Sequence, residues 1–441
     1  MKRSTRLTLI AGAVAVVLAG SAGIVWAVNA NHGSEDAAVA ATVPVALKVS
    51  GVPQDAPIGV IVTLGANPVG GAEWQTAAQG AAVAERRLQL GGTKIKLITV
   101  NDKGTTEGAR DAVAQLAKDS VAGIVFASAG VHTRAGVDAA RSAGIPTLLP
   151  YSSDPITTVG LTWRTGPDNA EFVNAINAAA GKAKRPLLIS AEGSPLNKVS
   201  HVDNIYIAPD TDTTVLAADI ALRAGMAPTV VAEGEPTPAP VENPADAVII
   251  NAPPAQQAQI VRAIQAANIS LPLVLSPGAT SPAFPAALRT ADGTVTGRLL
   301  TVGANTGDAV ALDRGAAGRS MSAFLAGVRV LAADGSAQNL TGDQPFSAVA
   351  AAADSRSHDA VIALVRAIEK AGSVEPAKVA EALRTLKLGA AEGIAGPTLD
   401  FEKPAAFTGS VTGLHASTDD LGLRPSVDGA VATVWYPLTS H

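Results

Sequence analysis

The sequence predicts an α/β fold of two lobes, each built on a doubly wound parallel β-sheet. Three observations support this prediction. Short and almost wholly apolar runs recur along the chain, as expected for strands that are covered on both faces of a parallel sheet. Segments with apolar residues at helical spacing separate these runs. The same alternation starts again after residue 165, so we expect right-handed βαβ units in two sheets.

The strands expected before residue 165 are Ile58–Thr63, Ile95–Val100, Ala122–Ala127 and Pro146–Leu149. The helical segments between them have apolar faces. These faces consist of Ala77, Ala81, Ala84 and Leu88 in the first segment, and of Ala109, Ala112, Val113 and Leu116 in the second. Because the connections are short, the strands should pair in parallel through helical crossovers.

The second half begins with a helix start, because Asp168 is an N-cap residue with Glu171 three positions later. The strands expected there are Pro186–Ser190, Ala247–Asn251 and Leu271–Leu275. Helical stripes are formed by Ile260, Val261, Ile264 and Ala267, and by Val361, Leu364, Val365 and Ile368. Pro376 stands where the first turn of a last helix tolerates proline.

Residues 1–30 have the pattern of an export signal or membrane anchor. Lys2, Arg3 and Arg6 precede an uncharged run from Leu7 to Val28, and such a basic start stays in the cytoplasm. The run is long enough to span a bilayer, yet small residues near Ala30 could also be cleaved. Both alternatives stay open, and either puts the folded part outside the cytoplasm. Residues 31–57 are predicted to be a linker, and residues 233–244 a proline-rich surface loop.

Composition excludes several classes of function. The chain has 33 Lys+Arg against 38 Asp+Glu, a net charge of −5, and only 3% aromatic residues. Nucleic-acid binding needs a basic excess or stacking aromatics, so no nucleic-acid partner is expected. The chain has no cysteine. Disulfides, thiolate metal sites, cysteine nucleophiles and lipid attachment to an N-terminal cysteine are therefore excluded.

Motifs for catalysis or cofactor binding are missing as well. The sequence has no glycine-rich dinucleotide or P-loop motif, no nucleophile elbow, and no His-Glu-x-x-His zinc motif. Asp210 and Asp212 lie in a segment without the Gly and Glu of a calcium loop. We therefore predict no cofactor, no metal site and no enzymatic activity, and an extracytoplasmic hydrolase is the least supported function.

Small, hydroxylated loops follow the third and fourth expected strands. They are Ser128–Thr133 and Pro150–Pro155. In open α/β sheets, ligands bind beyond the carboxyl ends of the strands, where small residues allow backbone amides to approach an anion. Ordinary helix capping uses the same residue types. The two interpretations are balanced on the residues alone.

Several segments in order resemble extracytoplasmic solute-binding proteins of the leucine/isoleucine/valine type. The similar segments are residues 58–74 (IGVIVTLGANPVGGAEW), 94–103, 122–130 (AGIVFASAG), 143–155 (AGIPTLLPYSSDP), 161–172 (LTWRTGPDNAEF), 244–276, 358–386 and 392–401. Together they cover most of residues 58–405.

The resemblance implies a type I periplasmic-binding-protein fold, in which two lobes joined by three hinge crossovers close on a ligand. It implies one lobe from residues 58–165 and about 279–395, and a second from 166–278 and about 396–441. The crossovers would lie near Arg164–Gly166, Ser276–Gly278 and Ala395–Pro397.

The resemblance also implies a set of ligand contacts. These are Trp74, Ser128, Ala129, Gly130, Ser152 and Ser153. His132 and Tyr151 are expected to matter less, and His132 is expected on an exposed helical turn. Two family features are absent: a Tyr-Gly pair after the first strand of the second lobe, and an acidic residue after Leu275. Glu192 or Asp154 would have to replace that acidic residue.

The implied function is capture of a small polar ligand, an amino acid or related compound, for the membrane permease of an ABC-type importer. The protein would act as a monomer. The alternative is a membrane-tethered sensor or scaffold with a degenerate binding cleft, which the divergent second lobe and the long apolar N-terminal run favour.

Overall fold

The computed structural model describes residues 44–438 except 66–69, 156–159, 193, 195, 197, 227–240, 296–298 and 426–432. The predicted export segment, residues 31–43 of the predicted linker and residues 233–240 of the predicted proline-rich loop lie outside these residues. In the described part of the chain, no helix is long and apolar enough to cross a membrane. Residues 44–55 have no helix or strand, but Leu47 is buried and its amide donates to the carbonyl of Arg87. This stretch therefore packs on the folded part instead of linking to it loosely.

The first sheet has five parallel strands in the order β2-β1-β3-β4-β5. They are β1 (Ala56–Val62), β2 (Ile95–Asn101), β3 (Ile124–Phe126), β4 (Thr147–Leu149) and β5 (Thr162–Arg164). Alternate residues of β1 face opposite sides, so Ile58 and Val60 enter one core cluster and Ile61 enters another. A sheet that is apolar on both faces must be covered by helices on both.

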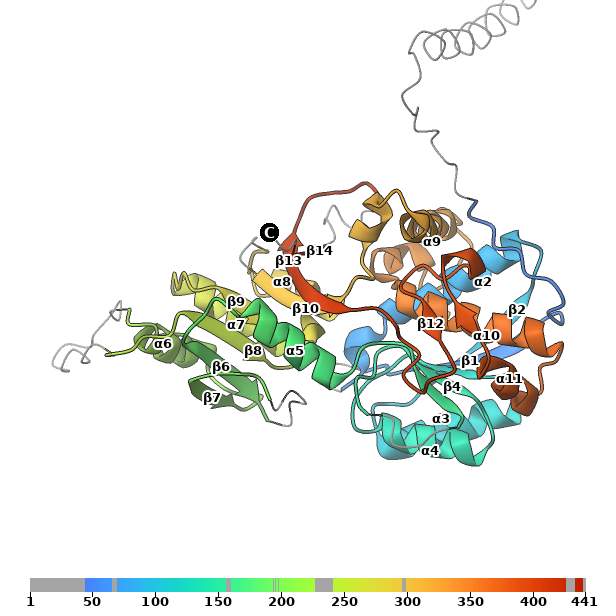
Figure 1. Cartoon of the computed structure of the whole chain (residues 1–441), viewed down its shortest axis with the longest axis horizontal. Helices are drawn as coiled ribbons and strands as arrows, with labels where there is room; N and C mark the ends of the chain where they lie inside the picture. The colour runs from blue at the N-terminus through green and yellow to red at the C-terminus, as the bar shows by residue number, and fades with distance from the viewer. Residues whose placement is uncertain are drawn as a thin grey trace, which may run out of the picture. The chain divides into compact units, whose positions relative to one another are not determined.

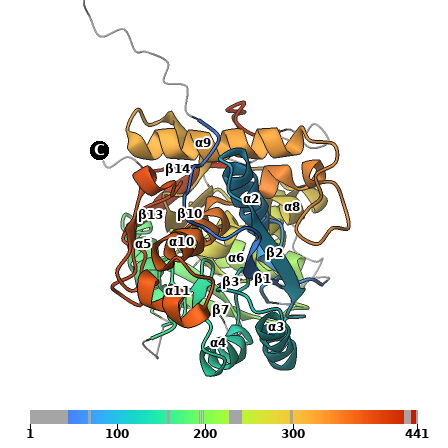
Figure 2. The same ribbon diagram turned by 90° about the vertical axis from the view of Figure 1, so that its right-hand side faces the viewer.

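Six helices surround the first sheet. They are α2 (Gly80–Leu90), α3 (Thr106–Lys118), α4 (Thr133–Ser142), α9 (Ala316–Ala332), α10 (Ser355–Ala371) and α11 (Pro376–Leu383). Helices α3 and α4 cover one face, and α2, α10 and α11 cover the other (Figure 1). Helix α9 packs outside α2 (Figure 2). A short hairpin of β11 (Lys387–Leu388) and β12 (Leu399–Asp400) follows α11.

The second sheet has seven strands in the order β14-β13-β10-β9-β8-β6-β7. They are β6 (Pro186–Ala191), β7 (Asp203–Ile207), β8 (Ala247–Asn251), β9 (Leu273–Leu275), β10 (Leu299–Ala304), β13 (Val411–Ser417) and β14 (Val434–Pro437). The last two strands are antiparallel to their neighbours, and the others are parallel. The helices of this lobe are α5 (Asn169–Ala179), α6 (Thr213–Arg223), α7 (Pro254–Ala266) and α8 (Ala283–Thr290). Helix α5 packs on one face and the other three on the opposite face.

The chain therefore forms the two α/β lobes that the sequence predicts, but it crosses between them later than predicted. The first crossover follows β5, as expected. Strand β10 still pairs with β9, so the return to the first lobe comes after Ala304 and not near residue 279. Ala405 still pairs with Arg164 in the first sheet, and Val411 is already part of the second sheet. The last crossover therefore lies between these two residues, and not near residue 396 as predicted. We call residues 44–165 and 305–410 the first lobe, and 166–304 and 411–438 the second lobe.

Candidate functional site

A cleft of about 890 Å³ lies at the carboxyl ends of the parallel strands of both lobes. The first lobe contributes the segments after β1, β3 and β4, together with the N-terminus of α10. The second lobe contributes the segments after β6, β8 and β9 and the end of β10. Loops at this end of a parallel sheet are where α/β proteins bind their ligands. The cleft is therefore the candidate site.

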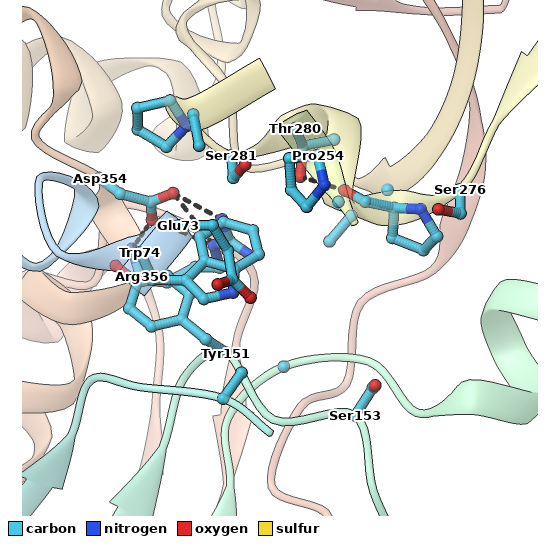
Figure 3. Close-up of a pocket in the computed structure, with 18 of the residues that line it drawn as sticks. Glu73, Trp74, Tyr151, Ser153, Pro254, Ser276, Thr280, Ser281, Asp354 and Arg356 are labelled. Carbon is cyan, nitrogen blue, oxygen red and sulfur yellow. Dashed lines mark hydrogen bonds and ion pairs between the residues drawn. The ribbon is translucent and has the colours of Figure 1, made fainter. Parts of the chain in front are cut away.

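Five of the six predicted ligand contacts line this cleft: Trp74, Ala129, Gly130, Ser152 and Ser153. The sixth, Ser128, is fully buried and does not line it. Ser153 is partly exposed and lies on the first-lobe side of the open space (Figure 3). The loops after β3 and β4 thus both border the cleft, and their contact with a ligand stays a prediction.

The hydroxyl of Ser128 belongs to a buried polar network inside the first lobe. Its Oγ lies 2.6 Å from Oγ1 of Thr63 and 3.1 Å from Nε2 of His132. The same Nε2 lies 3.0 Å from Oδ2 of Asp102, and Thr63 donates to Oδ1 of Asp102 at 2.7 Å. His132 is only 3% exposed, so the prediction that it lies on an exposed turn is wrong.

Ser128, His132 and Asp102 together contain the side chains of a hydrolytic triad, but not its geometry. In a triad the serine and the carboxylate contact different nitrogens of the histidine. One nitrogen takes up the serine proton, while the N–H on the other nitrogen donates to the carboxylate and so orients the ring. Here both contact Nε2. The network therefore holds the loop after β3 in place and cannot activate the serine as a nucleophile.

Trp74 forms an aromatic–arginine cluster with Tyr151 and Arg356. The two rings stack at an angle of 7°, with centroids 4.7 Å apart. The guanidinium carbon of Arg356 lies 4.6 Å from the Trp74 ring centroid and 4.7 Å from that of Tyr151. Burial and the nearby charge of Asp354 raise the pKa of Tyr151, so its hydroxyl stays neutral. All three residues line the cleft on its first-lobe side (Figure 3).

Local backbone geometry brings Trp74 into this position. Trp74 ends the 3₁₀ turn η1 (Ala72–Trp74), which Gly71 precedes with φ of 98°. At this φ an L side chain is strained, and a Cβ on Gly71 would collide with Oγ of Ser128. Only glycine lets the turn approach the buried network so closely. Gly71 also donates its amide to the carboxylate of Glu73 at 2.7 Å.

The lining of the cleft carries more acidic than basic side chains. The acidic residues are Glu73, Asp154, Glu192, Asp308 and Asp354, and the basic residues are Arg289, Arg356 and Arg424. Asp354 pairs with Arg356 at 2.7 Å, and Asp308 pairs with Arg424 at 2.6 Å. Burial raises the pKa of Glu73, because its charged form loses contact with water. A ligand with a cationic group would complement this balance.

The second lobe presents polar groups around a helix N-terminus. Pro254 and Ala255 of the first turn of α7 line the cleft beside Asn251 and Ser276. Ser276 Oγ accepts a hydrogen bond from Gln257 at 2.9 Å. Glu192 and Asp154, the proposed replacements for the missing acidic residue, both line the cleft.

Sequence reasoning missed Arg356 and Glu73 and undervalued Tyr151. No local pattern connects residue 356 with residues 74 and 151, because they meet only when α10 packs on the first sheet. One sequence signal lies near Arg356. Asp354, two residues earlier, is a residue typical of an N-cap, which places Arg356 in the first turn of a helix. Within the described residues, no cluster of His, Asp and Glu is arranged to hold a metal ion.

Comparisons with known proteins identify what the chain resembles. The family model described as "Periplasmic binding protein" matches residues 56–411. Among solved structures, a leucine-binding protein LivK from Thermotoga maritima aligns with a TM-score of 0.58 and 18% identity, over 86% of this chain and 98% of that one. The LivJ protein of Streptococcus pneumoniae, solved with isoleucine, gives 0.57 and 16%, over 87% and 100%. A substrate-binding protein from Desulfitobacterium hafniense, solved with leucine, gives 0.55 and 16%, over 87% and 99%. No curated protein sequence gives a significant match.

Proposed function

Because the chain belongs to the periplasmic binding protein family, we propose that it captures a small polar solute, an amino acid or related compound, in the cleft between its lobes. The family confirms the prediction of a binding protein and not an enzyme, and it implies that the lobes lie outside the cytoplasm. Delivery of the solute to the permease of an ABC importer, action as a monomer, and anchoring by residues 1–30 are parts of this proposal.

The observation that carries the proposal is the cleft itself. Its volume of about 890 Å³ is in the range of small-molecule sites. Ser152 and Ser153 of the first lobe and Asn251 and Ser276 of the second supply hydrogen-bonding groups to it. Glu73 supplies a carboxylate, and together these groups suit a small ligand that carries an ammonium group and an acceptor.

A thermal shift screen with amino acids and small amides tests this function. A ligand at 100 times its Kd stabilises the native state by about 2.7 kcal/mol, which a melting curve readily detects. We expect at least one member of the library to raise Tm without being converted to a product. A library that leaves Tm unchanged throughout would contradict the proposal.

The alternative, a membrane-tethered sensor or scaffold with a degenerate cleft, keeps one observation in its favour. Ser128 is fully buried and does not line the cleft, so one expected contact cannot reach a ligand. A library in which no compound raises Tm would support this alternative. Intact-mass measurement on the exported protein would show whether residues 1–30 are retained, which the tethered function requires.

A further inference from the structure

Arg356 is fixed in the wall of the cleft. Its Nε and Nη2 donate to the Asp354 carboxylate over 2.7 to 3.1 Å. Asp354 is also the N-cap of α10 and accepts from the backbone amide of Arg356 at 2.6 Å. Only 14% of the Arg356 side chain is exposed. The guanidinium is thus held by an ion pair, a helix cap and two rings, and it is part of the wall instead of a mobile arm.

This side chain contacts both stacked rings and so contributes to their burial. Trp74 is 6% exposed and Tyr151 is 7% exposed, although both border the open space. Bare stacked rings would bind hydrocarbon groups by burying apolar surface. With Arg356 against both rings, a ligand meets a guanidinium edge at this place.

The covered wall still has donors without partners. The Nη1 atom of Arg356 has no hydrogen-bond partner among the described residues, whereas Nε and Nη2 both bind Asp354. The hydroxyl of Ser281, which belongs to the second lobe, is buried without a partner and lines the same cleft. Figure 3 shows Ser281 on the side of the cleft that holds Asp354 and Arg356. The Ser281 hydroxyl, as a buried donor without a partner, favours a ligand that brings an acceptor.

We propose that Arg356 is the specificity-determining residue of this cleft: it selects a ligand with an amide-type oxygen at the aromatic wall and rejects a hydrocarbon group of the same size. A hydrocarbon group there would leave the Nη1 protons unpaired and gain no contact with the covered rings. Because Asp354 already neutralises Arg356 and the lining has an acidic excess, a neutral amide is favoured over a second carboxylate. This inference rests on the proposed function.

Calorimetric titration with two pairs of similar size tests the inference: glutamine against leucine, and asparagine against valine. We expect the native protein to bind the amide member about tenfold or more tightly than its apolar partner. In Arg356→Ala the rings of Trp74 and Tyr151 should be more exposed, and the apolar amino acid should bind more tightly than the amide. Arg366→Ala is the matched control, because Arg366 lies on the same helix, pairs with Glu369 and is 15% exposed, but does not line the cleft. It should keep the native order.

A second measurement does not depend on the ligand. Acrylamide should quench the fluorescence of Trp74 more strongly in Arg356→Ala than in the native protein, with Trp74→Phe identifying the signal of this residue. Arg356→Lys, which retains a cationic donor close to the reach of the guanidinium, should keep the preference for amides and guards against a folding defect in the alanine variant.

The outcomes separate the two proposals. If the apolar members bind the native protein more tightly, if Arg356→Ala keeps the native order, or if Trp74 quenching is unchanged, Arg356 does not set specificity, while the binding function stands. If no solute of the wider library binds the native protein, the proposed function fails and this inference fails with it.

Discussion

His358 is a titratable side chain that is excluded from water. It is fully buried, and its Nδ1 lies 2.8 Å from Asp359 while its Nε2 lies 2.9 Å from Nη1 of Arg87. Since an arginine only donates, Nε2 must accept and Nδ1 must carry the proton. Burial and the nearby Arg87 charge lower the pKa of His358. Arg87 itself has a pKa lowered by burial to about 10, so it stays charged at neutral pH.

This arrangement predicts how stability depends on pH. The folded state resists protonation of His358, whereas the unfolded chain takes up a proton near pH 6.5. Stability that is present above pH 6.5 is therefore lost as the pH falls toward the lower folded pKa, by at most about 1.4 kcal/mol per pH unit. Urea denaturation at pH 7.5 and 5.0 measures it.

In His358→Asn this contribution to the pH dependence should disappear, whereas replacing the exposed His201 should leave it unchanged. An equal pH dependence in the native protein and in His358→Asn would contradict the assignment.

Ser153 and Ser128 should respond differently to alanine substitution. Ser153 lines the cleft, so its loss should weaken binding of a charged ligand group by about 1.5 to 3 kcal/mol, tenfold to a hundredfold in Kd. Ser128 bonds Thr63 and His132 inside the lobe, so its loss should lower stability by about 1 kcal/mol. Titration and melting of both variants separate the roles. Unchanged affinity in Ser153→Ala would mean that this loop is only a structural turn.

At the residue scale, the sequence could predict loops but not which way their side chains point. Ser128 and Ser153 occupy similar positions after neighbouring strands, yet one is buried and the other borders the cleft. The difference comes from Thr63, His132 and Asp102, which are distant in sequence and meet only in the folded lobe. The sequence did not reveal Arg356 for the same reason, because Trp74 and Tyr151 are distant from it in the sequence.

Among the strands, those with a largely apolar run could be predicted, including β2 at an edge of the first sheet, whereas β7 at an edge of the second sheet could not. Strand β8 (Ala247–Asn251) is wholly buried and agrees with its predicted bounds. Edge strand β7 is mostly half-exposed and contains Tyr206, which is 81% exposed, so it lacks a continuous apolar run. Strand β10 is apolar, but its membership of the second sheet depends on pairing with β9 and β13, which no local pattern reveals. The predicted position of the second crossover was wrong for this reason.

The N-terminus of α5 combines a predicted element with a contact that the sequence did not reveal. Asp168 and Glu171 form the expected capping box. Asp168 also pairs with the buried Arg164 at 3.3 Å, and Arg164 donates to the carbonyls of Gly166 and Asp154. The cap therefore ties the first crossover to the first lobe.

Removal of this N-cap should lower the free energy of unfolding more than removal of an N-cap that has no arginine partner. We expect Asp168→Ala to lower the free energy of unfolding by about 1 to 2 kcal/mol, since it breaks a cap and leaves Arg164 without its carboxylate. Asp212→Ala is the control, because Asp212 caps α6 without pairing to an arginine. In denaturant unfolding, Asp168→Ala should have a lower free energy of unfolding than Asp212→Ala. The reverse order would show that the Arg164 contact contributes nothing.

For the whole molecule, the account requires a clamp whose lobes move on three crossovers. One further connection joins them, because Arg424 after β13 binds Asp308 and the carbonyls of Ala351 and Ala353 in the first lobe. Ligand binding can drive closure only if the closed state binds more tightly than the open state. With a solute found by thermal shift, small-angle scattering should show a smaller radius of gyration at saturation. An unchanged profile would indicate a rigid scaffold.

The central claim is that a small polar solute binds in the cleft between the lobes. The most direct measurement is calorimetric titration of that solute into the native protein and into Ala255→Trp, which fills the cleft from the first turn of α7. We expect one-to-one binding by the native protein and loss of binding, at a native Tm, in Ala255→Trp. Equal affinity for both proteins would show that the solute binds elsewhere and would contradict the account.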